Sequence, residues 1–183
     1  MDNLGVIVPF YNEKNTLADS IERLLSVNIF SEIILSDDNS NDGSDIIAKH
    51  YEEKKDNIKY IKSSTNKGKG NALNNAKNYI TTKFVVIHDA DLEYFPEDLV
   101  EMFKEAKLNP KSLIIGSRFI GNKKRINIYR RTYFANKVMS SFFSFVHFCK
   151  ISDIATCYKM MMTDIFKEID LYENGFSIEI EIV

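Results

Sequence analysis

Short runs of consecutive apolar residues alternate along this chain with longer stretches in which apolar residues recur every three or four positions. The runs are typical of buried strands, and the stretches are typical of amphipathic helices. We expect strands over residues 6–8, 32–36, 58–61, 84–87 and 113–115. We expect helices from a cap at residue 15 or 16 to residue 26, and over residues 44–53, 70–79 and 96–108. This alternation predicts an α/β fold, a mostly parallel sheet flanked by helices on both faces.

The pattern changes after residue 128. Residues 130–148 predict one long helix, and residues 160–167 predict a strand that passes into a helix. The long helix carries Tyr133 and Phe134 and, further along, a cluster of Phe142, Phe143, Phe145 and Phe148. Two interpretations of this cluster remain open. Core packing is the commoner role for such residues and is favoured. Alternatively, an aromatic face beside basic side chains suits an anionic membrane surface.

Charge is distributed unevenly along the chain. The net charge of −2 argues against a general nucleic-acid-binding protein. Residues 106–152, however, contain ten Lys or Arg and no Asp or Glu. This segment is predicted to face an anionic partner, although a solvated basic surface would give the same pattern.

The composition also indicates the size of the domain and the cellular compartment. The 183 residues suit a single domain. Two cysteines, Cys149 and Cys157, form neither a disulfide framework nor a zinc-site spacing. The chain shows no signal-peptide pattern and no apolar run of about 18 residues that could span a bilayer. We therefore expect a cytoplasmic protein that binds, if anything, peripherally to the inner face of a membrane.

Two carboxylates one residue apart, Asp89 and Asp91, follow the expected strand 84–87. The carboxyl ends of strands in an open α/β sheet are where ligands bind. Carboxylate oxygens suit Mg²⁺ or Mn²⁺, which are commonly held by one or two carboxylates together with substrate phosphates. The same edge is therefore expected to bind a phosphate-bearing ligand.

Polar residues follow the other expected strands too. Tyr11 could stack on a base, and Glu13 could hydrogen-bond it or a ribose. Asp37 and Asp38 should point to opposite sides, so that one of them faces a ligand. Each motif alone is explained equally well by a turn or a helix cap, but together they predict a site for a nucleotide diphosphate and a divalent ion. The remaining motifs are Lys69 with its flanking glycines, which could receive an anion, and Arg118, which could reach a phosphate.

Six motifs in order resemble the family 2 inverting glycosyltransferases, most closely those that transfer sugars to dolichyl or polyprenyl phosphate. The resemblance extends from about residue 4 to residue 182. The motifs are Val8-Pro9-Phe10-Tyr11-Asn12-Glu13, Asp37-Asp38-Asn39-Ser40, Asn66-Lys67-Gly68-Lys69-Gly70-Asn71-Ala72-Leu73, Asp89-Ala90-Asp91-Leu92-Glu93-Tyr94, Gly116-Ser117-Arg118-Phe119 and Thr156-Cys157-Tyr158-Lys159.

The resemblance implies a GT-A fold and a nucleotide-sugar donor, a UDP- or GDP-sugar. It implies one domain, with the nucleotide bound by about residues 1–120 and the acceptor by about residues 121–183. By the resemblance, base and ribose contacts are implied for Pro9, Tyr11, Glu13 and Asp38. Metal and diphosphate contacts are implied for Asp89 and Asp91, with Asp91 as the direct metal ligand, Ala90 between them and Glu93 nearby.

Further roles are implied on the diphosphate and acceptor sides. Arg118 would contact the diphosphate, and Lys69 could add to that contact. Arg130 or Arg131 would contact the acceptor phosphate, and Glu181 would place an acidic group near the acceptor.

The acceptor decides what further chemistry is needed. A polyprenyl phosphate is already anionic and requires no general base, only a cationic dock, for which the stretch from Lys123 to Lys137 is the candidate. A saccharide hydroxyl requires a carboxylate base, for which Glu179 and Glu181 are candidates, followed by Asp153. Two rival interpretations are a nucleotide-sugar-binding domain without turnover and a haloacid-dehalogenase-type phosphatase in which the first aspartate is a nucleophile.

Overall fold

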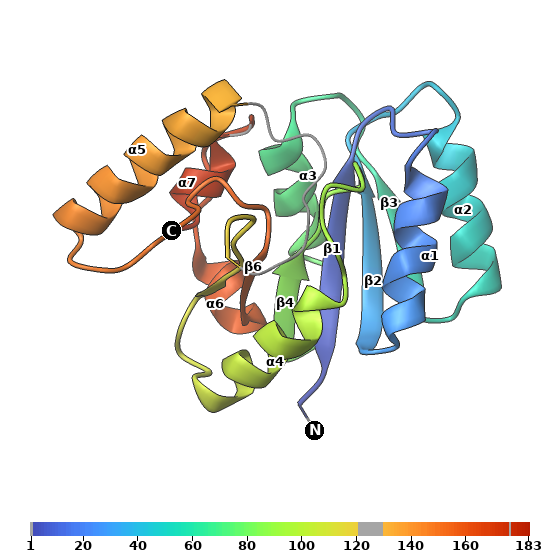
Figure 1. The fold of residues 1–183 in the computed structure, drawn as a ribbon. Coiled ribbons are helices and arrows are strands. Elements are labelled where there is room, and N and C mark those ends of the chain that lie inside the picture. The colour runs from blue at the N-terminus through green and yellow to red at the C-terminus, as the bar shows by residue number, and fades with distance from the viewer. Residues whose placement is uncertain (1, 121–129, 176) are drawn as a thin grey trace.

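The computed structural model describes residues 2–120, 130–175 and 177–183, and gives Arg130 as backbone only. Figure 1 shows a central sheet with helices packed against both faces. The strands are β1 (Leu4–Phe10), β2 (Phe30–Asp37), β3 (Ile58–Lys62), β4 (Phe84–Ile87), β5 (Ile114–Ile115) and β6 (Lys159–Met162). The helices are α1 (Leu17–Val27), α2 (Ser44–Lys54), α3 (Lys69–Ala76), α4 (Asp98–Leu108), α5 (Arg130–Val146), α6 (Thr163–Glu168) and α7 (Ile178–Glu181).

The sheet order is β3-β2-β1-β4-β6-β5. Strands β1 to β4 pair in parallel, and β6 runs antiparallel between β4 and β5. The predicted mostly parallel α/β sheet is therefore confirmed. The chain winds from β1 outward to β3 and then returns to the other side of β1 as β4. The carboxyl ends of β1 and β4 thus flank a topological switch point, where sheets of this kind bind ligands.

Alternation along the strands divides the core into two layers. Val6 and Val8 of β1 pack on one face with residues of α1, α2 and α4. Ile7 packs on the other face with residues of α3, α6 and α7. Because helices cover both faces, all seven residues of β1 are buried, as expected for a central parallel strand with a continuous apolar run.

Most expected elements are present with shifted ends. The first strand extends over four more residues than 6–8, and α3 ends three residues before the predicted residue 79. The predicted strand-to-helix passage over residues 160–167 is confirmed as β6 followed by α6. Neither the short helix α7 nor the insertion of β6 between β4 and β5 was predicted, because each depends on contacts with distant segments.

Helix α5 lies at the end of the molecule opposite α2 (Figure 1). Its inward face is polar: Asn136 and Ser140 are buried, and Ser144 is half-buried. These side chains bond the segment 151–155, with Asn136 Nδ2 donating to Asp153 Oδ1 at 2.8 Å. The favoured prediction of core packing is wrong for three of the four residues of the phenylalanine cluster, Phe142, Phe145 and Phe148, which are exposed. Tyr133 and Phe134 on the same helix are exposed as well. In the described part of the chain, no helix has both the length and the apolar character needed to cross a bilayer.

Candidate active site

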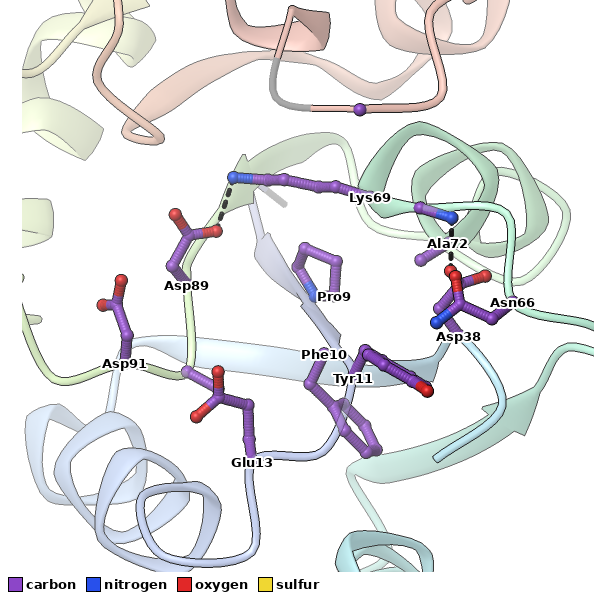
Figure 2. A pocket seen from close by; sticks show the side chains of 13 residues that line it. Pro9, Phe10, Tyr11, Glu13, Asp38, Asn66, Lys69, Ala72, Asp89 and Asp91 are labelled. Carbon is purple, nitrogen blue, oxygen red and sulfur yellow. Dashed lines mark hydrogen bonds and ion pairs between the residues drawn. The ribbon is translucent and has the colours of Figure 1, made fainter. Parts of the chain in front are cut away.

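A cavity of about 290 Å³ opens at the carboxyl ends of β1, β2 and β4, beside the first turn of α3 (Figure 2). Register places the ends of β1 and β2 level with each other, while β4 ends beside Ile7 of β1. Phe10 pairs with Asp37, and the N–H of Asp38 donates to the carbonyl of Phe10 at 2.9 Å. Eight residues predicted for the site line the cavity: Pro9, Tyr11, Glu13, Asp38, Lys69, Asp89, Ala90 and Asp91.

Figure 2 shows how these side chains are arranged. Asp89 and Asp91 stand on one side of the cavity and Asp38 on the other, while Lys69 spans the gap above Pro9. Tyr11 is 43% exposed and therefore accessible to a planar ligand. The cavity thus offers an aromatic surface near one end and a pair of carboxylates at the other.

The two aspartates at the end of β2 face opposite ways, as predicted. Asp37 is fully buried and accepts hydrogen bonds from the Tyr60 hydroxyl at 2.9 Å and the Ser40 N–H at 2.7 Å. Asp38 turns to the cavity, where its Oδ2 accepts the N–H groups of Lys67 and Gly68. Asp38 therefore fixes the loop before α3 while remaining in the cavity wall.

Lys69 is the centre of a partly buried charge network. Its Nζ lies 2.5 Å from Asp89 Oδ1 and also contacts Glu179 Oε1 of α7. The other oxygen of Glu179 is 2.5 Å from Nζ of Lys159, a fully buried residue of β6. Burial alone would lower the pKa of Lys69, but the charges of Asp89 and Glu179 outweigh it and raise that pKa. The network therefore holds Lys69 as an ammonium ion.

Asp91 sits at the rim of the cavity. Its side chain is exposed on one side, yet desolvation by the surrounding protein and, second, the neighbouring Asp89 charge raise its pKa to about 6. Residues 2–120, 130–175 and 177–183 hold no cluster of three or more His, Cys, Asp or Glu side chains that could bind a metal ion. Asp89 and Asp91 fit a divalent ion as two oxygen ligands, the number that Mg²⁺ often takes from protein when substrate phosphates and water complete its shell.

Arg118 does not line this cavity. Its Nε and Nη2 each lie 2.9 Å from an oxygen of the buried Asp153, and its Nη1 is 3.9 Å from Glu93. Asp153 also binds Asn136, so Arg118 is connected to α5 through one carboxylate. The arginine follows β5 at the same edge of the sheet, and its predicted contact with a diphosphate stays a prediction.

The predicted acceptor-side residues are not brought into the cavity either. Glu181 accepts the N–H groups of Tyr172 at 2.9 Å and Glu173 at 3.0 Å. Arg131 is exposed on α5. The side chain of Arg130 lies outside the described residues, as does residue 123 where the predicted cationic dock begins. The roles of all these residues stay predictions.

The sequence suggested Glu179 only as a candidate base and did not predict the contact between Glu179 and Lys69. Those two residues are 110 positions apart, and no local pattern links them. Five lining residues were not predicted for the site: Phe10, Asn66, Gly68, Ala72 and Gly175. All but Gly175 stand within the quoted motifs, so the motifs themselves were a usable signal for them.

A family model described as "Glycosyl transferase family 2" matches residues 5–170. The chain is 26% identical over 181 residues to glycosyltransferase AglJ of Haloferax volcanii, covering 98% of this chain and 57% of that protein. It is also 26% identical over 184 residues to the dolichol-phosphate mannosyltransferase of Pyrococcus furiosus, covering 98% and 52% respectively. The chain thus spans little more than half the length of these relatives.

A solved structure with a similar fold is that of glucosyl-3-phosphoglycerate synthase from Mycobacterium tuberculosis. That protein was crystallised with Mn²⁺, UDP and glucosyl-3-phosphoglycerate. The TM-score is 0.73 at 17% identity, and the match covers 99% of this chain and 63% of that one. A similarity at this level of identity concerns the fold.

Proposed function

Because the chain belongs to glycosyl transferase family 2 and has a GT-A fold, we propose that it transfers a sugar from a nucleotide-sugar donor with the help of a divalent metal ion. The observation that carries this proposal is the cavity at the switch point, which gathers eight predicted donor-site residues from four separate segments. Membership of this family also argues against the rival interpretation of a haloacid-dehalogenase-type phosphatase.

The nucleoside would occupy the end of the cavity near Tyr11. The exposed Tyr11 ring offers an apolar face for the base. Pro9 and Glu13 would border the base, and Asp38 would accept from a ribose hydroxyl. A nucleotide bound this way directs its diphosphate toward Asp89 and Asp91 at the other end (Figure 2).

Asp89 and Asp91 would hold Mg²⁺ or Mn²⁺, with Asp91 as the direct ligand. Once bound, such an ion neutralises negative charge on the leaving diphosphate. The presence of both Mn²⁺ and UDP in the Mycobacterium tuberculosis structure supports a divalent ion beside the nucleotide, not the choice of these two residues. The Lys69 ammonium lies beside Asp89 and adds positive charge where the diphosphate would sit.

We further propose a polyprenyl-phosphate acceptor at a membrane surface. A hydroxyl acceptor would need a carboxylate base, yet none of the three candidates lines the cavity, and each is held by cations or backbone N–H groups. Glu179 binds two lysines, Asp153 binds Arg118, and Glu181 binds two backbone N–H groups. An acceptor phosphate needs no base. The similarity to a dolichol-phosphate mannosyltransferase also supports this choice.

The test is a thermal-unfolding panel of UDP- and GDP-sugars with and without Mn²⁺, followed by turnover with a polyprenyl phosphate. One sugar donor should stabilise the protein only when Mn²⁺ is present, by about 2.7 kcal/mol at a hundredfold excess over Kd. Asp91→Asn should lose the Mn²⁺-dependent stabilisation by the donor. Without ligand, it should unfold at the same temperature as the wild type. Stabilisation that is equal without metal, or absent for every donor, would contradict the proposal.

A further inference from the structure

The Lys69 ammonium binds Asp89, one of the two carboxylates proposed to hold the metal ion. Lys69 extends from the first turn of α3 across the cavity, and its Nζ is 2.5 Å from Asp89 Oδ1 (Figure 2). This is hydrogen-bonding distance, so that oxygen is engaged. A divalent ion approaching Asp89 would meet a positive charge already in place.

The position of Lys69 is set from two sides. The second partner, Glu179, stands on α7, and Lys159 of β6 holds the other oxygen of Glu179. The ammonium therefore lies between two carboxylates from different elements, and its side chain is only 10% exposed. A lysine held this way keeps its ion pair with Glu179 when its bond to Asp89 is broken.

The glycines beside Lys69 make this arrangement possible. The Gly70 N–H donates to the carbonyl of Asn174 at 3.0 Å. A Cβ atom at Gly68 or Gly70 would collide with the backbone of residues 173–174. The absence of side chains lets the C-terminal segment cross directly over the start of α3, which brings Glu179 to Lys69.

We propose that Lys69 is a built-in counter-cation that keeps a divalent ion off Asp89 until a nucleotide diphosphate enters, and that it then moves to the diphosphate while Glu179 retains it. The inference rests on the proposed sugar-donor and metal site. Ammonium and metal ion repel each other at Asp89, whereas the diphosphate is an anion that can accept both. Metal and nucleotide should therefore bind with positive coupling.

The decisive measurement is the affinity of Mn²⁺ alone, read from the electron paramagnetic resonance signal of free Mn²⁺ at constant pH. Lys69→Met should bind Mn²⁺ without nucleotide at least tenfold more tightly than the wild type. The same variant should bind the nucleoside diphosphate with Mn²⁺ more weakly. The matched control is Lys49→Met, which removes a lysine from an exposed ion pair with Asp45 and should change neither affinity.

Equal or weaker Mn²⁺ binding by folded Lys69→Met, judged by near-ultraviolet circular dichroism, would overturn the inference. Two further measurements do not depend on that variant. The wild type should bind Mn²⁺ at least tenfold more tightly with UDP or GDP than with the nucleoside alone, and equal affinities would overturn the inference. Glu179→Gln should leave Lys69 on Asp89 and weaken binding of Mn²⁺ alone, and tighter binding would overturn it.

The outcomes separate this inference from the proposed function. The Lys69→Met comparison uses Mn²⁺ without nucleotide, so it reports on the counter-cation alone. Failure of both UDP and GDP to bind the wild type with Mn²⁺ would instead refute the sugar-donor site.

Discussion

At the scale of single residues, His88 is a buried titratable group next to the cavity residue Asp89. It follows β4 directly, precedes Asp89 and is 1% exposed. Its ring nitrogens lie 3.2 Å from Ser20 Oγ and 3.1 Å from the Tyr158 hydroxyl oxygen. Desolvation is the main cause that lowers its pKa to about 4. The imidazole is therefore neutral in the folded protein at pH 7 and anchors the carboxyl end of β4.

The depressed pKa of His88 predicts loss of stability in acid. Between pH 6.5 and about 4 the unfolded chain binds a proton on this residue that the folded protein excludes. The contribution of His88 to stability is therefore fully present above pH 6.5 and is lost as the pH falls across this window, by roughly 3 kcal/mol. Protonation of Asp91, whose pKa is raised to about 6, acts in the opposite direction, so the contribution of His88 is read from the difference between wild type and His88→Gln. Urea unfolding at several pH values would measure it. The free energy of unfolding of His88→Gln should rise relative to that of the wild type as the pH falls from 6.5 to 4, and a constant difference would contradict the assignment.

A substitution at Glu181 tests whether the acceptor is a lipid phosphate or a saccharide hydroxyl. The Glu181 carboxylate accepts two backbone N–H groups outside the cavity. We therefore expect Glu181→Gln to lower turnover with a lipid-phosphate acceptor by less than about tenfold. Removal of a general base would instead lower turnover by about 10²–10⁴-fold. Steady-state assays on the folded variant would measure this. A near-total loss of turnover with an intact fold would point to a base and a hydroxyl acceptor.

At the scale of elements, α5 has its polar face toward the protein and its aromatic face outward. Phe142 and Phe145 are 70% and 79% exposed, while Ser140 on the other side is 2% exposed. A solvent-facing helix in a globular domain normally shows the reverse arrangement. Together with the acid-free segment around it, this outward aromatic face supports the proposed membrane-surface acceptor.

Replacing both Phe142 and Phe145 with Ser should therefore leave the fold intact and weaken binding to anionic vesicles. The side chains contribute little to the core, so we expect the free energy of unfolding to change by about 0.5 kcal/mol or less for each. Vesicle co-sedimentation and thermal unfolding would measure the two effects. The control Ile46→Ser removes a side chain that is 70% exposed on α2 and should not alter vesicle binding. Unchanged binding by the double variant would contradict the membrane role of α5.

At the scale of the whole molecule, the C-terminal segment returns to the nucleotide-binding part of the chain. β6 enters the sheet between β4 and β5, and the residues before α7 cross α3 at Gly68 and Gly70. The two parts predicted to bind nucleotide and acceptor therefore share one sheet and one charge network. Lys159 and Glu179 from the second part hold Lys69 of the first.

Gly70→Ala tests this crossing. In an ordinary helix the change stabilises by about 1 kcal/mol, but here the added methyl group would collide with the Glu173 carbonyl. We expect a net destabilisation of about 1–3 kcal/mol, as for overpacking in a core, measured by urea unfolding. The matched control is Gly175→Ala, because a Cβ atom at Gly175 meets nothing within 4 Å. A stabilised Gly70→Ala would show that the segments do not pack this closely.

Local patterns were sufficient to predict the α/β sheet and most of its elements, since side-chain periodicity depends only on neighbours along the chain. They also placed Tyr11, Asp38 and Asp89 at one edge, because parallel strands all end there. The tertiary structure alone decided which partners these groups have. Sheet order and helix packing bring Lys69 to Glu179 and Arg118 to Asp153. They also decide which face of α5 points outward. The energies of these contacts depend on distance in space, which no spacing in the sequence encodes.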